Sequence, residues 1–161
     1  VYAKHYKTGE AIPDELIKKM GKSSHFNQGF ITVEYLAASL LDMNYHTLTD
    51  DKPVDTNQFE IDYFKKIGLI PEIISRYRST YFGHIIGGYD SGYHAYIWAE
   101  VLDCDAFEAF KETDLFNQKY AKSFRENILA SGGMVDEAEM YRKFRGRDAK
   151  IDGLLKKRGL L

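Results

Sequence analysis

One stretch of the chain, residues 84–100, concentrates the side chains that could take part in chemistry. Tyr89, Tyr93 and Tyr96 are spaced i, i+4 and i+7, and His84 precedes them. On a helix this spacing places three phenols on one face. A phenol with a pKa of about 10 stays protonated at neutral pH, so each tyrosine can donate a hydrogen bond to developing negative charge. The stretch therefore predicts a surface that stabilises an anionic transition state.

The same tyrosines also have a purely structural interpretation. A tyrosine on an apolar helix face is most often a packing residue whose hydroxyl finds a local partner. Gly87 and Gly88 lie between His84 and the tyrosines, and two adjacent glycines let the backbone bend. For any one tyrosine the structural interpretation is favoured, and this combination weakens that preference for the set, although the stretch offers stabilising groups without a nucleophile. From spacing alone both interpretations stay open.

Common catalytic motifs are absent from the rest of the sequence. It contains no H-E-x-x-H, G-x-S-x-G, Walker loop or G-x-G-x-x-G, and no two histidines at i, i+4. The carboxylates of Asp103 and Asp105 are two residues apart, so they point in different directions on a helix and we expect both to be exposed. Cys104 has apolar neighbours, which predicts a buried and unreactive thiol. The stretch 84–100 is thus the one constellation with a mechanism attached.

Length and composition limit the class of protein. A chain of 161 residues with a net charge of -2 fits one domain with its own core and does not favour a nucleic-acid surface. The sequence has no run of about 18 apolar residues, so we expect no membrane span. One cysteine allows no internal disulfide and fits a reducing compartment. We expect a cytoplasmic protein, with the periplasm as the alternative.

The hydrophobic pattern repeats with helical spacing and nowhere alternates long enough for a strand, which predicts an all-α fold. The predicted helices cover residues 13–21, 32–48, 57–67, 71–77, 90–111, 114–130, 136–144 and 151–157. Pro13 suits the first position of its helix and Gly21 the end of it. Thr32 is the expected cap of the longest uninterrupted pattern, and Asp90 and Ser91 are the expected caps of the helix that carries the tyrosines.

Several long motifs follow one another along essentially the whole chain. They are Phe26-Asn27-Gln28-Gly29-Phe30, Glu34-Tyr35-Leu36-Ala37-Ala38, Leu41-Asp42-Met43 with His46, the stretch 84–100, Asp105-Ala106-Phe107, Phe124-Arg125, Ile128-Leu129, Gly132-Gly133, Phe144-Arg145-Gly146-Arg147, and Leu154-Leu155 with Arg158-Gly159-Leu160. In this order they resemble the closing third of the family of oligopeptidase A, thimet oligopeptidase and peptidyl-dipeptidase. The bacterial peptidyl-dipeptidase branch is the most similar.

The resemblance implies a fold, a cofactor and a place in a longer protein. Residues 1–161 would form a single all-helical domain, the multi-helical C-terminal catalytic subdomain of a thimet oligopeptidase-like (neurolysin-like) zinc metallopeptidase. Family members hold zinc with H-E-x-x-H and a third Glu upstream of this region, and those residues are absent here. The start at Val1 rather than Met also suggests a fragment. Zinc would belong to the full-length parent, and the fragment alone would hold none and be inactive.

The resemblance also implies residue roles in hydrolysis of short peptides, with dipeptides released from their C-termini. The catalytic residues would be Tyr96, His84 and Tyr89, and the substrate-binding residues would be Tyr93, Gly87 and Gly88. Tyr96 would donate to the oxyanion of the tetrahedral intermediate, with Tyr89 and His84 assisting or contacting substrate. The two glycines would let the loop move over the substrate.

Some residues depart from the family pattern or allow two interpretations. His94 stands where the family often has a second tyrosine, and Asp148-Ala149 replaces a turn that usually contains proline. Arg145 and Arg147 could anchor a peptide carboxylate, but packing against a helix end or a carboxylate is the favoured interpretation. Neither departure touches the motif of residues 84–100.

A different class of function remains as the alternative: a non-catalytic helical module that binds peptides or protein partners. A tyrosine-rich face next to glycines suits binding as well as catalysis. The expected partners are short peptide substrates and the missing N-terminal part of the same protein. If that part is missing, the face that packs against it would be apolar and exposed, and the fragment would self-associate.

Overall fold

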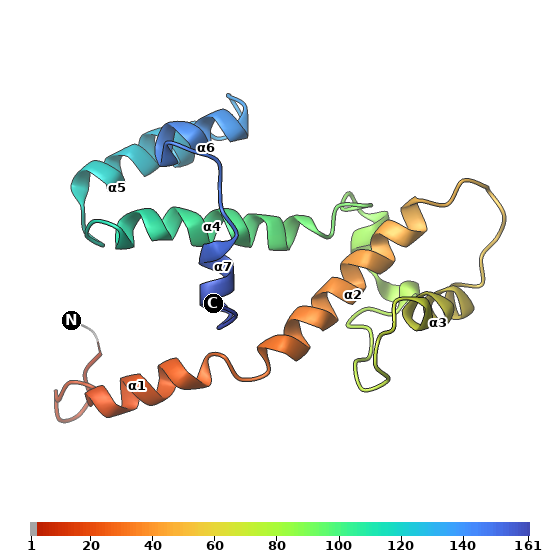
Figure 1. Cartoon of the computed structure of the whole chain (residues 1–161), viewed down its shortest axis with the longest axis horizontal. Helices are drawn as coiled ribbons and strands as arrows, with labels where there is room; N and C mark the ends of the chain where they lie inside the picture. The colour runs from red at the N-terminus through yellow and green to blue at the C-terminus, as the bar shows by residue number, and fades with distance from the viewer. Residues whose placement is uncertain (1–2) are drawn as a thin grey trace.

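The computed structural model describes residues 3–161, which form helices joined by turns and loops (Figure 1). They contain no strand, only an isolated antiparallel bridge between Lys4 and Ala11, so the predicted all-α class is confirmed. The helices are α1 (Asp14–Ser23), α2 (Gln28–His46), α3 (Thr56–Lys66), α4 (Ala95–Lys111), α5 (Gln118–Phe124), α6 (Glu137–Arg145) and α7 (Asp152–Lys157), with 3₁₀ segments η1 (Ser79–Tyr81) and η2 (Gly83–Ile86) and a π-helical segment η3 (Arg125–Leu129). The extent of the single domain stays a prediction.

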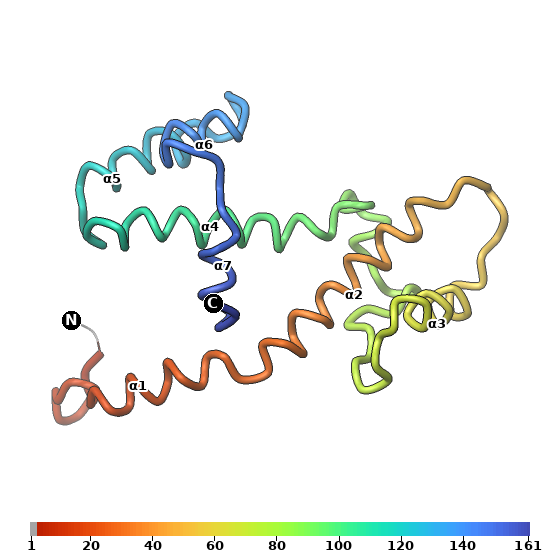
Figure 2. The backbone as a smooth tube through the Cα atoms, in the orientation of Figure 1, coloured from red at the N-terminus to blue at the C-terminus, as the bar shows by residue number. Residues whose placement is uncertain are grey.

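The core is divided among three groups of buried side chains. The first joins the middle of α2 to the loop before α4 and comprises Tyr35, Ala38, Phe82 and Tyr93. The second joins α4 to α6 and comprises Ala106, Ala109, Tyr141 and Phe144. The third joins α4 to α7 through Val101, Cys104 and Leu154. In the backbone trace of Figure 2, the loop before α4 lies beside the C-terminal half of α2.

The C-terminal helix connects the two long helices. The Arg158 guanidinium donates to the Thr32 hydroxyl on α2 at 3.0 Å and to the Glu100 carboxylate on α4. Lys157 adds a second ion pair to Glu100, with Nζ 3.1 Å from Oε1. The end of α7 therefore supplies a cation that links α2 to α4, and it helps to fix the angle between these two helices (Figure 1).

Several predicted helix boundaries are wrong by a few residues. α2 begins at Gln28 rather than Thr32, because Asn27 adopts a left-handed φ of 57° and turns the chain directly into the helix. α1 continues past Gly21 to Ser23. α5 begins only at Gln118, where the Asn117 side chain accepts hydrogen bonds from the amides of residues 119 and 120. The predicted helices at 57–67, 136–144 and 151–157 are confirmed to within about one residue at each end.

The predicted helix at 71–77 is wrong. Residues 71–78 form turns and bends, and η1 and η2 follow. Glu60, buried on α3, holds this segment: its Oε2 accepts from the Ser79 amide and hydroxyl, each at 2.9 Å, and its Oε1 lies 2.6 Å from Arg78 Nε. A charge-assisted contact with a distant carboxylate outweighs the local helical pattern.

Asp105 is buried, contrary to its prediction as an exposed carboxylate, whereas Asp103 is exposed. Asp105 accepts hydrogen bonds from the Tyr141 hydroxyl at 2.7 Å and from Arg147 Nη2 at 2.8 Å, and Arg145 Nε lies 3.2 Å away. Burial alone would raise the pKa of Asp105, but the hydrogen bonds and the two guanidinium charges outweigh it and hold this pKa below its usual value. Arg145 and Arg147 thus pack against a carboxylate, as the favoured interpretation predicted.

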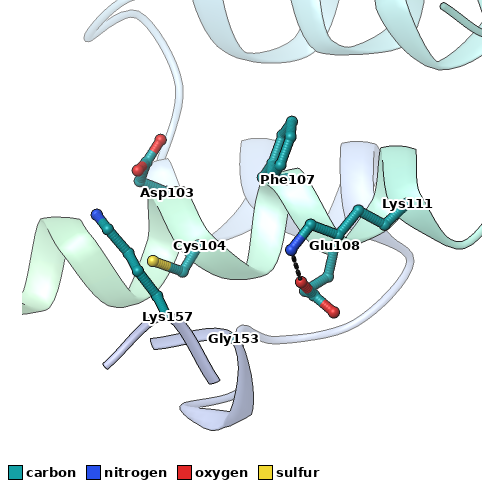
Figure 3. A pocket seen from close by; sticks show the side chains of 7 residues that line it. All are labelled: Asp103, Cys104, Phe107, Glu108, Lys111, Gly153 and Lys157. Atoms are coloured by element: carbon teal, nitrogen blue, oxygen red, sulfur yellow. Dashed lines mark hydrogen bonds and ion pairs between the residues drawn. The ribbon is translucent and has the colours of Figure 1, made fainter. Parts of the chain in front are cut away.

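Cys104 lies in the interface between α4 and α7, beside a cavity of about 440 Å³ (Figure 3). The cavity is lined by Asp103, Cys104, Phe107, Glu108, Lys111, Gly153 and Lys157. The thiol is buried as predicted, and burial raises its pKa, which keeps it protonated and unreactive at neutral pH. The two helices approach closely at Gly153, where an added Cβ would lie 3.0 Å from the Cys104 carbonyl.

Across residues 3–161, the structure has no helix that is both long enough and apolar enough to cross a lipid bilayer.

Candidate active site

The structure gathers His84, Tyr89, Tyr93 and Tyr96 into one group of rings, called the tyrosine cluster below. The rings come together in a different way from the one predicted. α4 begins at Ala95, so Tyr89 and Tyr93 precede the helix and the prediction of a single helix face from residue 90 is wrong. A turn closed by the Gly92 amide, which donates to the Tyr89 carbonyl at 2.8 Å, brings the rings together instead.

The rings contact one another in specific orientations. Tyr89 and Tyr96 are stacked almost parallel, with centroids 5.6 Å apart and planes 3° apart. The His84 ring meets both edge-on, at 5.8 Å from Tyr89 and 6.0 Å from Tyr96. Tyr93 lies 5.0 Å from His84 and 5.3 Å from Tyr96. His84 therefore folds back toward the tyrosines, and edge-to-face contacts of this kind hold the rings in place.

Exposure divides the tyrosines into two kinds. Tyr89 is 45% exposed and Tyr96 is 46% exposed, so both can meet a ligand. Tyr93 is only 3% exposed and packs against Tyr35, with ring centroids 5.5 Å apart, and against Phe82 at 5.0 Å. In this structure Tyr93 supports the surface from beneath. Its contact with substrate stays a prediction.

The phenols of Tyr93 and Tyr96 stay protonated at neutral pH. Burial raises the pKa of Tyr93 to about 12. The pKa of Tyr96 is also raised, by partial desolvation and then by the adjacent Tyr89 phenol. A raised pKa means that each hydroxyl keeps its proton throughout the neutral range. Tyr96 is both exposed and protonated, so its hydroxyl can donate a hydrogen bond to an anion.

The backbone geometry of the loop explains why glycine occupies positions 87 and 88. Gly88 has a φ of +94°, a conformation that side chains with a Cβ rarely adopt. At Gly87 an added Cβ would lie 2.9 Å from the Gly83 carbonyl oxygen. The Tyr89 amide donates to the His84 carbonyl at 3.2 Å across the same bend. The glycines therefore allow the tight turn that places His84 beside Tyr89, and their role in loop movement stays a prediction.

Replacing Gly87 with alanine is expected to shift this turn and lower the melting temperature of the chain, because the new methyl group meets a backbone carbonyl that cannot rotate away. Gly83→Ala is the matched control, since a Cβ at Gly83 meets nothing within 4 Å. Thermal unfolding followed by circular dichroism compares the two variants. Equal melting temperatures for Gly87→Ala and Gly83→Ala would contradict the steric argument.

Asp42 and Tyr35, both on α2, contact the backbone of the tyrosine cluster, and no role was predicted for either. Asp42 accepts hydrogen bonds from the amides of Ser91 and Tyr93, and the Tyr35 hydroxyl bonds to the backbone of Tyr93 and Ile97. In the sequence, the one indication of these contacts was a polar residue within the apolar stripe of a helix. It did not identify the partners, which lie about 50 to 60 residues away.

The exposed residue His94 lies outside the tyrosine cluster and lines an apolar groove with Trp98 and Ile97. Nowhere in the part of the chain that the structure describes do three His, Cys, Asp or Glu side chains lie close enough to hold a metal ion.

Comparison with known proteins decides the family. The sequence profile of Peptidase family M3 matches residues 1–160. The chain belongs to this family. Membership in family M3 confirms the resemblance found in the motifs and agrees with the helical fold.

Individual relatives support the assignment to family M3 along the whole chain. Dipeptidyl carboxypeptidase of Escherichia coli is 41% identical over 162 residues, which cover 99% of this chain and 24% of the relative. Oligopeptidase A of Haemophilus influenzae is 34% identical and covers 98% of this chain, and saccharolysin of Saccharomyces cerevisiae is 37% identical and covers 97%. The chain spans between 22% and 24% of the length of these relatives.

Proposed function

We propose that the chain is part of a longer zinc-dependent M3 peptidase that hydrolyses short peptides, and that Tyr96 is its oxyanion donor. The observation that carries the proposal is the exposed and stacked pair of Tyr89 and Tyr96, with His84 against both rings, in a chain of this family. Similarity to a relative named dipeptidyl carboxypeptidase supports removal of dipeptides from peptide C-termini. The single cysteine supports a cytoplasmic location.

Peptide hydrolysis places negative charge on the carbonyl oxygen when the carbon becomes tetrahedral. A hydrogen-bond donor fixed at that position stabilises the charge without having to reorganise during the reaction. We propose that the Tyr96 hydroxyl is this donor, because its side chain is 46% exposed and its ring is held between Tyr89 and His84. Tyr89 holds the Tyr96 ring by stacking and faces the substrate, and His84 restrains both rings from the side. Tyr93 fixes the floor beneath them.

The residues of this chain do not by themselves fit a zinc site. Among residues 3–161 no group of three metal-binding side chains converges, and the full sequence lacks H-E-x-x-H. We therefore propose that the metal ligands belong to another part of the parent protein. The contribution assigned to the chain is to bind and orient the peptide and to donate hydrogen bonds.

Measuring bound zinc tests the proposal that the metal ligands belong to another part of the parent protein. The purified 161-residue chain, incubated with zinc and then desalted, is expected to retain far less than one zinc per chain and to cleave no peptide, because zinc is bound tightly by three or four converging ligands. Elemental analysis by mass spectrometry gives the ratio. A ratio of one zinc per chain would contradict the proposal. A desalted sample without added zinc is the control.

A non-catalytic binding module is the second candidate, and one observation favours it. α1 has no buried residue, and its Leu16, Ile17 and Met20 side chains are exposed. An apolar face of this kind fits contact with a partner. Under our proposal the partner is the remainder of the same peptidase, and self-association would cover the face in the isolated chain. Peptidase activity of the parent that depends on Tyr96 distinguishes the first candidate from the second.

A further inference from the structure

We infer that Asp42 and Tyr35 are positioning residues that fix the backbone on both sides of Tyr96 and so aim its hydroxyl. The two side chains come from α2, whereas Tyr96 belongs to the first turn of α4. The inference rests on the proposed function, because it gives these residues a catalytic consequence through Tyr96. The contacts that define it are independent of that function.

Asp42 holds the turn before α4. Its side chain is 0% exposed, and its two oxygens accept from two backbone amides: Oδ1 from Ser91 at 2.9 Å and Oδ2 from Tyr93 at 2.9 Å. His46 lies on the same side, with Nδ1 2.9 Å from Oδ1 and 3.2 Å from the Ser91 amide. A buried carboxylate is costly unless hydrogen bonds compensate it, and bonds to a charged acceptor are the stronger kind. Ser91 has a φ of 52°, so this turn needs such support.

Tyr35 holds the start of the helix. Its hydroxyl donates to the Tyr93 carbonyl at 2.7 Å and accepts from the Ile97 amide at 3.1 Å. The first amides of a helix lack partners within the helix, and α4 has no side-chain cap from its own N-cap residue. The Tyr35 hydroxyl therefore takes the place of a cap, although it belongs to another helix. Residue 96 lies between the two backbone groups that this hydroxyl joins.

The positions of Asp42 and Tyr35 on α2 let both residues hold the backbone around Tyr96 at once. They are seven residues apart, which is about two helical turns, so both project from the same side of α2. A rigid helix thus sets the distance between the turn at residues 91–93 and the amide of residue 97. Loss of either contact would let the first turn of α4 fray and would change where Tyr96 points, while the rest of the fold could remain intact.

Hydrogen exchange of the 161-residue chain, followed amide by amide by NMR, tests the contacts. Asp42→Asn is expected to speed exchange of the Ser91 and Tyr93 amides about tenfold or more, and Tyr35→Phe to do the same at Ile97. The control is Asp55→Asn, because Asp55 also accepts from two backbone amides, but through one oxygen at the exposed start of α3, and it is expected to leave exchange at residues 91, 93 and 97 unchanged. Unchanged exchange at residues 91, 93 and 97 would overturn the inference.

Kinetics of the full-length peptidase test the catalytic consequence. Tyr35→Phe is expected to lower kcat about tenfold to hundredfold with KM within about twofold, because a small displacement of a catalytic group lowers kcat by this order. In a Tyr96→Phe background the same change is expected to lower kcat less than about threefold, since residues that act through one another are not additive.

The outcomes separate the inference from the proposed function. Equal losses in both backgrounds would overturn positioning and leave Tyr35 a stabilising residue only. A Tyr96→Phe variant with unchanged kcat would overturn the proposed role of Tyr96 and, with it, the catalytic part of the inference. Unchanged exchange in a peptidase that needs Tyr96 would overturn the inference alone.

Discussion

Replacing Tyr96 with phenylalanine is expected to lower kcat of the full-length peptidase about 10²–10³-fold with little change in KM. The substitution removes one oxygen atom and keeps the ring, so the stack on Tyr89 and the edge contact with His84 survive. Under the proposed function, the lost hydrogen bond acts on charge that develops in the transition state, so the loss is expected in kcat.

Steady-state kinetics with a short peptide whose C-terminal dipeptide is released will measure both constants. Tyr81→Phe is the matched control, because Tyr81 is an exposed tyrosine of η1 that lies outside the tyrosine cluster. It is expected to keep kcat and KM unchanged. If Tyr96→Phe retains kcat within about threefold of the unmodified enzyme, Tyr96 is not the oxyanion donor.

Replacing Asp105 with alanine is expected to destabilise the fold by about 3–5 kcal/mol, the usual cost of removing one partner from a buried ion pair. Asp105 is 2% exposed, and its carboxylate accepts from Tyr141, Arg145 and Arg147. Without it, the nearly buried Arg145 side chain keeps one partner, the exposed Glu112, with Nη2 2.6 Å from Oε1. The Tyr141 hydroxyl keeps its contact with the Leu102 carbonyl at 3.2 Å.

Urea unfolding of the 161-residue chain, followed by circular dichroism, gives the change in free energy. Asp103→Ala is the control, because Asp103 is an exposed aspartate on the same helix two residues away, and its loss is expected to cost about 0.5 kcal/mol or less. A cost below about 1 kcal/mol for Asp105→Ala would contradict the importance of this network.

The helical class and the family follow from local information, and both were predicted from the sequence. Helical spacing of apolar residues is set within a few turns, and caps such as Asp55 and Asp136 mark helix starts with adjacent residues. The residues of the tyrosine cluster were also identified, because their types and the glycines before them are unusual in combination. Their arrangement was not, since an i, i+4, i+7 pattern favours one helix and residues 89–94 form turns instead.

The failures share a physical cause. The turn at residues 91–93 depends on Asp42, about 50 residues earlier, and the non-helical segment after α3 depends on Glu60. Asp105 looked like an exposed carboxylate because its arginine partners are 40 and 42 residues further along. In each case a buried carboxylate is paired with residues far along the chain, and these partners cannot be found from spacing.

The contact between Thr32 and Arg158 joins residues that are 126 positions apart. A ribosome makes a chain from its N-terminus, so α2 leaves the exit tunnel long before α7 does. The contacts among α5, η3 and α6 are close in sequence and can form early, whereas α2 and α4 gain their link through Arg158 only when α7 has been made. The link from α7 to α2 and α4 is therefore completed late in synthesis, whereas the contacts of Asp42 and Tyr35 with residues 91–97 need only the part of the chain made before it.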